Sequence, residues 1–168
     1  MIKNAYLAGG CFWCIAYAIE QIEGVNKVIS GYCGGEEINP SYEDVKAQKT
    51  SHRETIKVIY DNQVLSYHDL LKLYLENVDP FDDGGQFIDR GYSYTLAIYY
   101  NDLAEYEIAR ALITELEKKT QKNVYIALEP FNCFYEAEEE HQDYYAKEPI
   151  AFNEELIKSG RKKGEQLK

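Results

Sequence analysis

Two hydrophobic patterns alternate along the chain and predict strands and helices in turn. Five short runs are apolar or alternate between apolar and polar residues, as strands do: residues 5–8, 25–32, 52–60, 94–100 and 124–130. Between these runs, apolar residues recur at helical spacing from Phe12, after Ser66 and after Asp102. The order is therefore strand, helix, strand, strand, helix, strand, helix, strand.

This order predicts an α+β fold. We expect a two-layer α/β sandwich, with helices packed on one face of a mixed, mostly antiparallel sheet and a ferredoxin-like core. A length of 168 residues is ordinary for a single domain, so we expect one domain over residues 1–168. From about residue 150 we expect a charged C-terminal tail that ends in a loosely held helix.

Glu54 lies on the apolar side of its predicted strand. Residues alternate over 52–60, so Glu54 shares a face with Ile56, whereas Arg53 and Lys57 share the other. A carboxyl group in this position is either a buried acid or an edge carboxylate paired with Arg53 or Lys57.

Net charge limits the possible partners. The chain has 29 Asp and Glu against 18 Lys and Arg, a formal charge of -11, which repels phosphate backbones and anionic lipid. No apolar run is long enough to span a bilayer, and no secretory signal is visible, so we expect a cytoplasmic protein without nucleic-acid or membrane partners. Much of the negative charge falls in residues 136–143, which we interpret as a solvated helix face.

The segment GGCFWC, residues 9–14, is the strongest candidate for chemistry. Cys11 stands at the start of a predicted helix, where free amide groups and the helix dipole favour the thiolate and lower the pKa of a thiol. The glycine pair allows the backbone to approach a ligand. A redox pair, half of a metal site and a buried structural turn are the three interpretations.

Metal binding is the weakest of these interpretations. Cys33 and Cys133 belong to no second paired motif, and the histidines are scattered at positions 52, 68 and 141, so we expect no metal site. A general CxxC thiol-disulfide oxidoreductase stays an alternative. Phe12 and Trp13 are, however, bulky for a surface that docks large disulfide partners.

Six motifs follow one another along the chain. They are GGCFWC (9–14), GYCGG (31–35), NPSYEDV (39–45), SHRETIKVIYD (51–61), GGQFIDRGYSY (84–94) and FYEAEEEHQDYYAKEP (134–149). In this order they resemble the A-type peptide methionine sulfoxide reductases. The resemblance implies that methionine S-sulfoxide, free or in proteins, is reduced to methionine through a cysteine sulfenic acid. It also implies thioredoxin as the reductant and no bound cofactor, and the chain has no flavin or nicotinamide fingerprint.

The resemblance also implies roles for single residues. Cys11 matches the family's nucleophile, and Glu54 matches the acid that protonates the sulfoxide oxygen. Phe12 and Trp13 match the apolar wall around the substrate methyl group.

Three further matches concern the polar side of the site. Tyr32 and Tyr94 match tyrosines whose hydroxyls bind the sulfoxide oxygen, and Asp89 matches an acidic residue that binds substrate and orients the pocket. Tyr144 and His141 lie in a matched motif, and of these two only Tyr144 is expected near the site.

The thiol that resolves the sulfenic acid stays open. Cys14 is preferred, because three residues along a frayed first helical turn can bring two sulfurs within bonding distance. Cys33, Cys133 and an external thiol are the alternatives. A non-catalytic methionine-binding module is a further reading of the same sequence.

Overall fold

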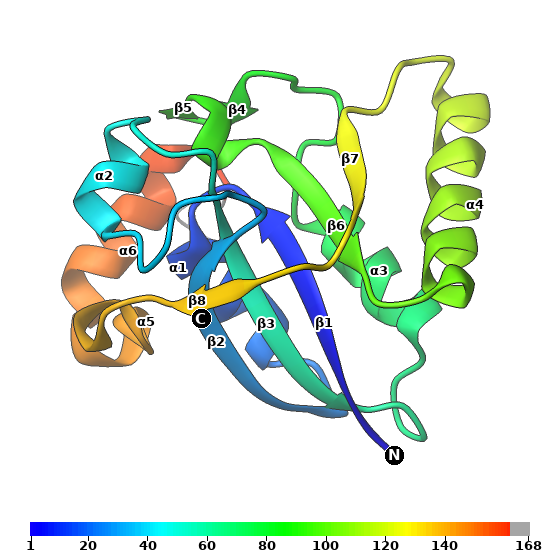
Figure 1. Cartoon of the computed structure of the whole chain (residues 1–168), viewed down its shortest axis with the longest axis horizontal. Coiled ribbons are helices and arrows are strands. Elements are labelled where there is room, and N and C mark those ends of the chain that lie inside the picture. The colour runs from blue at the N-terminus through cyan, green and yellow to red at the C-terminus, as the bar shows by residue number, and fades with distance from the viewer. Residues whose placement is uncertain (162–168) are drawn as a thin grey trace.

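A curled sheet of six strands forms the centre of the structure, a computed structural model that describes residues 1–161 (Figure 1). The strand order is β7-β6-β1-β3-β2-β8. The bounds are β1 (Ile2–Gly9), β2 (Val25–Cys33), β3 (Arg53–Asp61), β6 (Leu96–Tyr100), β7 (Ile126–Pro130) and β8 (Phe134–Glu136). β1 pairs antiparallel with β3 and β6, and β2 pairs antiparallel with β3 and β8. β6 and β7 are parallel, so the sheet is mixed.

Six helices and a small hairpin complete the described residues. The helices are α1 (Phe12–Glu20), α2 (Tyr42–Lys46), α3 (Tyr67–Glu76), α4 (Leu103–Thr120), α5 (Tyr144–Lys147) and α6 (Pro149–Ser159). Two 3-10 turns cover Tyr92–Tyr94 and Glu139–His141, and the hairpin consists of β4 (Gly85–Gln86) and β5 (Asp89–Arg90).

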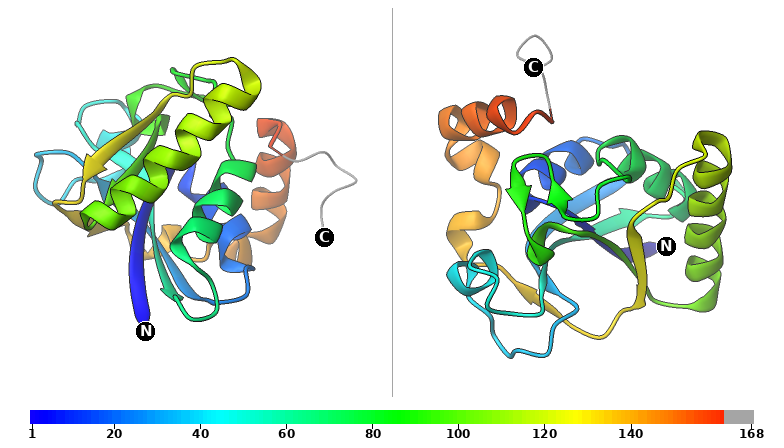
Figure 2. Two further views of the ribbon diagram at one scale, coloured as in Figure 1. Left: turned by 90° about the vertical axis from the view of Figure 1, so that its right-hand side faces the viewer. Right: turned by 90° about the horizontal axis from the view of Figure 1, so that it is seen from above.

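The two faces of the sheet are covered differently, because side chains alternate along each strand. Leu7 and Ile56 point to the face covered by α1 and α3, where they are fully buried in the main core. Tyr6 points to the opposite face, where its ring stacks on Phe131 with centroids 3.9 Å apart. The connection from β7 to β8 crosses this second face, while α1, α3 and α6 lie behind the sheet (Figures 1 and 2). Residues 11 and 54 both belong to the helix-covered side.

The predicted strands and helices are confirmed, with shifts of a few residues at their ends. Ser66 and Asp102 cap α3 and α4: their side chains accept the amides of Asp69 and Glu105 at 3.0 and 2.9 Å. The strand expected from residue 94 begins at Leu96 instead. α2, α5, β8 and the β4–β5 hairpin are additional elements that the hydrophobic pattern did not predict.

The prediction about the acidic segment is right in part, and the one about the C-terminal segment is wrong. The acidic side chains of residues 136–143 are solvated as expected, but they do not form a helix face: the segment contains a short 3-10 turn, Glu139–His141, in which His141 is buried. The tail is not loosely held as far as Ser159, because α6 buries Phe152 and Leu156 beside Cys14. Burial of side chains of this size contributes about 1.5–3 kcal/mol each, which is enough to dock a short helix.

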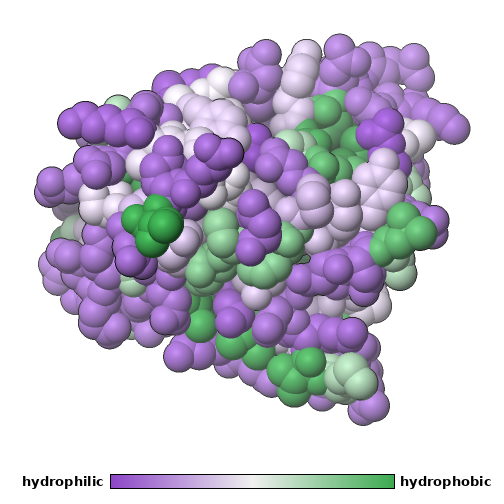
Figure 3. Space-filling model, in the orientation of Figure 1, coloured by the Kyte–Doolittle hydropathy of each residue, from purple (hydrophilic) through white to green (hydrophobic). Residues whose placement is uncertain are grey.

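The surface agrees with the composition. The face shown in Figure 3 is mostly hydrophilic, with hydrophobic residues in small separate patches. Over residues 1–161, no helix has the length and apolar character needed to cross a membrane.

Candidate active site

Cys11 is the N-cap residue of α1, as predicted. Its carbonyl accepts the amides of Cys14 and Ile15 at 3.2 and 3.3 Å, which begins the helix. The next amide in the chain, that of Phe12, donates to Oε1 of Glu54 at 3.1 Å. The Glu54 carboxyl group on β3 is therefore fixed at the N-terminus of α1, one residue from Cys11.

Glu54 is a buried acid and not an edge carboxylate. Only 1% of the residue is exposed, and the pKa of its carboxyl group is raised well above the usual 4.5, first by burial and then by the nearby Cys11. Its second oxygen, Oε2, is buried without a geometrically defined hydrogen-bond partner among the described residues, and the Tyr94 hydroxyl is near enough to lower the pKa of the carboxyl group slightly. Arg53 pairs instead with Glu129, at 2.9 Å. Glu54 thus holds a proton and has one free oxygen.

The prediction of a lowered pKa for the Cys11 thiol is wrong. The pKa of its thiol is raised well above the usual value, first by the Cys14 side chain and then by burial, since Cys11 is 6% exposed. The amide of Cys14 acts in the opposite direction, as expected at a helix N-terminus, but is outweighed. A protonated Cys11 thiol and a protonated Glu54 carboxyl group therefore share the site at rest.

The glycine pair before Cys11 makes room for protein side chains rather than for a ligand, contrary to our interpretation. Gly10 has a φ of +85°, and a Cβ there would meet Gln86 and Arg161 at 2.6 and 2.5 Å. Arg161 follows α6 and donates to the carbonyls of Gly9 and Asn77. The turn that presents Cys11 is therefore held by the C-terminal segment.

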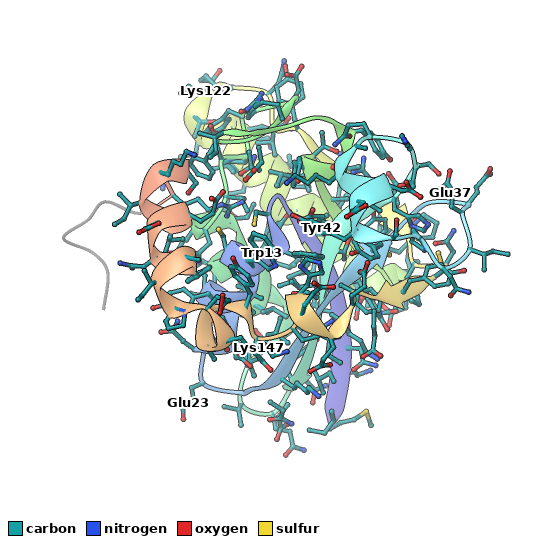
Figure 4. The ribbon with its side chains drawn as sticks, turned by 90° about the vertical axis from the view of Figure 1, so that its left-hand side faces the viewer. Trp13, Glu23, Glu37, Tyr42, Lys122 and Lys147 are labelled. Carbon is teal, nitrogen blue, oxygen red and sulfur yellow. The ribbon has the colours of Figure 1, made fainter. Side chains whose placement is uncertain are left out.

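Aromatic rings form the wall beside Cys11. Phe12 is fully buried, and Trp13 stacks on Tyr144 with centroids 4.0 Å apart. Tyr42 stacks on His141 at 4.1 Å, and its ring centroid is 6.0 Å from Phe12 and 5.9 Å from Trp13. Trp13 and Tyr42 lie between the α2 and α6 ribbons in Figure 4. These rings can surround a small apolar group.

The other predicted site residues are in the same region. Tyr32 on β2 is fully buried with its ring 5.8 Å from Phe12, and the pKa of its hydroxyl is raised first by burial, then by Glu138 and then by Glu54. Tyr94 is 7% exposed, and burial and then Glu54 raise its pKa. The pKa of Asp89 on β5 is raised first by burial. Its charge in turn helps to raise the pKa of both Cys11 and Glu54.

Two residues near the site were missed. Tyr42 has its pKa raised by burial and then by Glu54 and Cys11, so its hydroxyl faces the same cluster. Glu138 accepts the Tyr32 hydroxyl at 2.8 Å. Tyr42 lies in the motif NPSYEDV and Glu138 in FYEAEEEHQDYYAKEP. The motifs therefore contained the signal, but the sequence alone gave these two residues no role.

The second thiol of GGCFWC lies on the α6 side of α1. Cys14 is 3% exposed and packs with Phe152 and Leu156. A cavity of about 420 Å³ reaches it, lined also by Tyr17, Ala18, Gln21, Glu76, Asn77, Val78, Phe87, Leu156 and Arg161. Arg161 places its guanidinium over the Phe87 ring, 4.9 Å from the centroid.

The remaining cysteines lie on the opposite face of the sheet. Cys33 is buried with Tyr6 and Tyr99, and its thiol donates to the carbonyl of Cys133 at 2.8 Å. Strand alternation explains this, because Tyr32 points toward Phe12 and its neighbour must point away. In the part of the chain that the structure describes, no three His, Cys, Asp or Glu side chains are grouped to hold a metal ion.

Comparison with known proteins agrees with this geometry. The family model described as "Peptide methionine sulfoxide reductase" matches residues 3–168. Peptide methionine sulfoxide reductase MsrA of Halalkalibacterium halodurans is 41% identical over 162 residues, which cover 95% of this chain and 92% of that protein. This chain belongs to the peptide methionine sulfoxide reductase family.

Solved structures share the fold. Reduced Mxr1 of Saccharomyces cerevisiae has a TM-score of 0.84 and 27% identity, covering 89% of this chain and 87% of the yeast chain. A second structure of Mxr1, described as a complex with Trx2, has a TM-score of 0.58 and 19% identity, covering 85% and 84%. The fold that positions Cys11 and Glu54 in this reductase is thus shared with these solved structures.

Proposed function

We propose that this protein reduces methionine S-sulfoxide, free or in oxidised proteins, to methionine. The observation that carries the proposal is the pair formed by Cys11 and Glu54: a thiol at a helix N-terminus beside a buried, protonated carboxyl group. Sulfoxide reduction needs both a sulfur nucleophile and a proton for the departing oxygen. Membership in the reductase family supports the same reaction.

In the first step, the Cys11 sulfur attacks the sulfoxide sulfur and forms an S–S bond, while Glu54 gives its proton to the oxygen, receives the thiol proton of Cys11, and the S–O bond breaks. The released hydroxide then attacks the Cys11 sulfur, and the S–S bond breaks with its electron pair returning to the methionine sulfur. The products are methionine and a sulfenic acid on Cys11, so the substrate is reduced by two electrons and Cys11 is oxidised by two. The free Oε2 of Glu54 supports this role, because a protonated oxygen without a partner can donate to a substrate.

In the second step, the Cys14 thiol attacks the sulfenic sulfur, releases water and forms a Cys11–Cys14 disulfide. Cys14 is favoured because it lies beside Cys11, where its side chain is the largest cause of the raised pKa of the Cys11 thiol. Cys33 and Cys133 lie across the sheet, so they are disfavoured as resolving thiols.

Thioredoxin then reduces the disulfide by thiol-disulfide exchange and becomes oxidised itself. The solved complex of yeast Mxr1 with Trx2 supports this choice of reductant. The cavity beside Cys14 supports an approach from the α6 side.

The substrate is held by the residues around Cys11. Phe12 and Trp13 form the apolar wall for the methyl group, which the stacked rings support. Tyr32 and Tyr94 line the space around the sulfoxide oxygen, and Asp89 orients the pocket.

A general CxxC thiol-disulfide oxidoreductase is the alternative. It is disfavoured because thiol-disulfide exchange needs no proton donor such as the buried Glu54 beside Cys11. A non-catalytic methionine-binding module would have no use for the protonated Glu54.

One assay separates these functions. Purified protein is given the R and S epimers of methionine sulfoxide in turn, with dithiothreitol as reductant, and insulin in a parallel reaction. We expect turnover of the S epimer alone and none by Cys11→Ser. Insulin reduction without sulfoxide turnover would support the oxidoreductase, and binding of sulfoxide without thiol consumption would support the binding module.

We also propose a core topology, a domain organisation and a cellular compartment for this protein. Strands β1, β3, β2 and β6 with helices α1 and α3 form a ferredoxin-like core, supported by the order β6-β1-β3-β2. Residues 1–168 form one domain. The protein acts in the cytoplasm, supported by its four free cysteines.

A further inference from the structure

The segment that follows β8 is held tightly against β2. The amide of Ala137 donates to the Ser30 carbonyl at 2.9 Å. The side chain of Gln142 accepts the Ser30 amide at 2.9 Å and donates to the carbonyls of Ser30 and Ala137 at 2.8 and 2.9 Å. Glu138 therefore projects from a segment fixed on both sides.

The Glu138 carboxylate connects two parts of the site. Its Oε1 accepts the hydroxyl of the buried Tyr32 at 2.8 Å, and its Oε2 accepts the amide of Tyr42 at 3.0 Å. Tyr42 opens α2, so this amide has no partner within the helix. One side chain thus ties β2 and α2 together.

The two groups that Glu138 holds belong to residues whose rings both lie beside Phe12. Tyr32 has its ring centroid 5.8 Å from Phe12, and Tyr42 lies 6.0 Å from the same ring. Both oxygens of Glu138 are occupied, although the residue itself reaches solvent.

The number of protons on each hydroxyl then distinguishes Tyr32 from Tyr42 and Tyr94, the other tyrosines near Glu54. A tyrosine hydroxyl has one proton to donate, and a sulfoxide oxygen can only accept. The Tyr32 proton is directed to Glu138, so Tyr32 has none left for the substrate oxygen while this bond persists.

We propose that Glu138 is a positioning residue for sulfoxide binding: it fixes the Tyr32 hydroxyl and the Tyr42 backbone, and it leaves Tyr94, with Tyr42, rather than Tyr32 to donate to the sulfoxide oxygen. This inference rests on the proposed function and adds a division of labour between Tyr32 and Tyr94. The sequence of residues 136–143 does not by itself distinguish Glu138 from the other acidic residues there.

Binding measured apart from chemistry tests the positioning role. In a Cys11→Ser background, the fluorescence of Trp13, the only tryptophan of the chain, reports the dissociation constant of methionine S-sulfoxide. We expect Glu138→Ala to raise that constant about fivefold or more, since two hydrogen bonds are lost, and Glu138→Gln to raise it less, since one acceptor oxygen stays. Glu140→Gln, which removes the same charge from an exposed position two residues away, should leave it unchanged.

Two comparisons complete the test. Tyr94→Phe should weaken binding more than Tyr32→Phe, and Glu138→Ala should add less to Tyr32→Phe than it does to the background alone. Equal constants for the Glu138 and Glu140 variants, or a larger loss for Tyr32→Phe, would overturn the inference. If Glu138→Ala does not fold in a urea titration, Glu138→Gln decides. Failure of the proposed function would be recognised separately, as absence of S-sulfoxide turnover by the unmodified protein.

Discussion

The amide of Phe12 donates to the carboxyl group of Glu54 at 3.1 Å, across 42 positions of sequence. This bond joins the first turn of α1 to the strand β3, and it orients the acid beside Cys11. Because Glu54 is buried with its other oxygen unpartnered, its proton is available to a substrate bound beside Phe12 and Trp13.

Replacing Glu54 should slow chemistry with little effect on structure. Glu54→Gln keeps an oxygen that can accept the Phe12 amide but has no acidic proton. We expect the single-turnover rate of methionine formation from the S epimer to fall about a hundredfold or more, as general acids contribute. Rapid-quench measurement of methionine checks this, with the exposed Glu23→Gln as control. An unchanged rate would remove Glu54 from proton transfer.

The same pair of proteins should differ in how stability depends on pH. The raised pKa of Glu54 means that the folded protein holds this proton more tightly than the unfolded chain, whose glutamates titrate near 4.5. The stabilisation is therefore complete below pH 4.5 and is lost as pH rises through the higher folded pKa. Urea unfolding from pH 4 to 8 should show Glu54→Gln gaining stability over the parent as pH increases. Parallel curves for the two proteins would contradict a raised pKa.

Cys14 should be needed for recycling but not for the first reduction. In Cys14→Ser, one methionine per protein should still form, while thioredoxin-dependent turnover should fall on the order of a hundredfold because the sulfenic acid is not resolved. Mass mapping of the parent after one turnover should find Cys11 joined to Cys14. Cys33→Ser and Cys133→Ser serve as controls with normal turnover. A disulfide from Cys11 to either of these residues would exclude Cys14 as the resolving thiol.

Arg161 should control access to Cys14. Its guanidinium fastens the end of α6 to Gly9 and Asn77, and Leu156 of the same helix covers Cys14. In Arg161→Ala, α6 should open more often, so alkylation of Cys14 by iodoacetamide should accelerate on the order of tenfold. Peptide mass mapping over time gives the rate, and Lys158→Ala, an exposed change in the same helix, is the control. Equal rates in both variants would show that Arg161 does not hold the helix closed.

Local pattern predicted the elements and the placement of Cys11 and Glu54. Strand alternation put Glu54 on the buried side, helical spacing put Cys11 at an N-terminus, and ordered motifs indicated the family, all of which are properties of neighbouring residues. Short elements such as α2 and β8 were missed because they contain too few residues to show a period.

Only the tertiary structure decided the electrostatics and the partners. The pKa of Cys11 follows from burial and from the Cys14 side chain, and these outweigh the helix N-terminus, the only effect that the sequence reveals. The contacts of Glu138 with Tyr32 and of Arg161 with Gly9 join residues 106 and 152 positions apart. Such pairs depend on how the sheet curls and where its connections return, and no local periodicity carries that information.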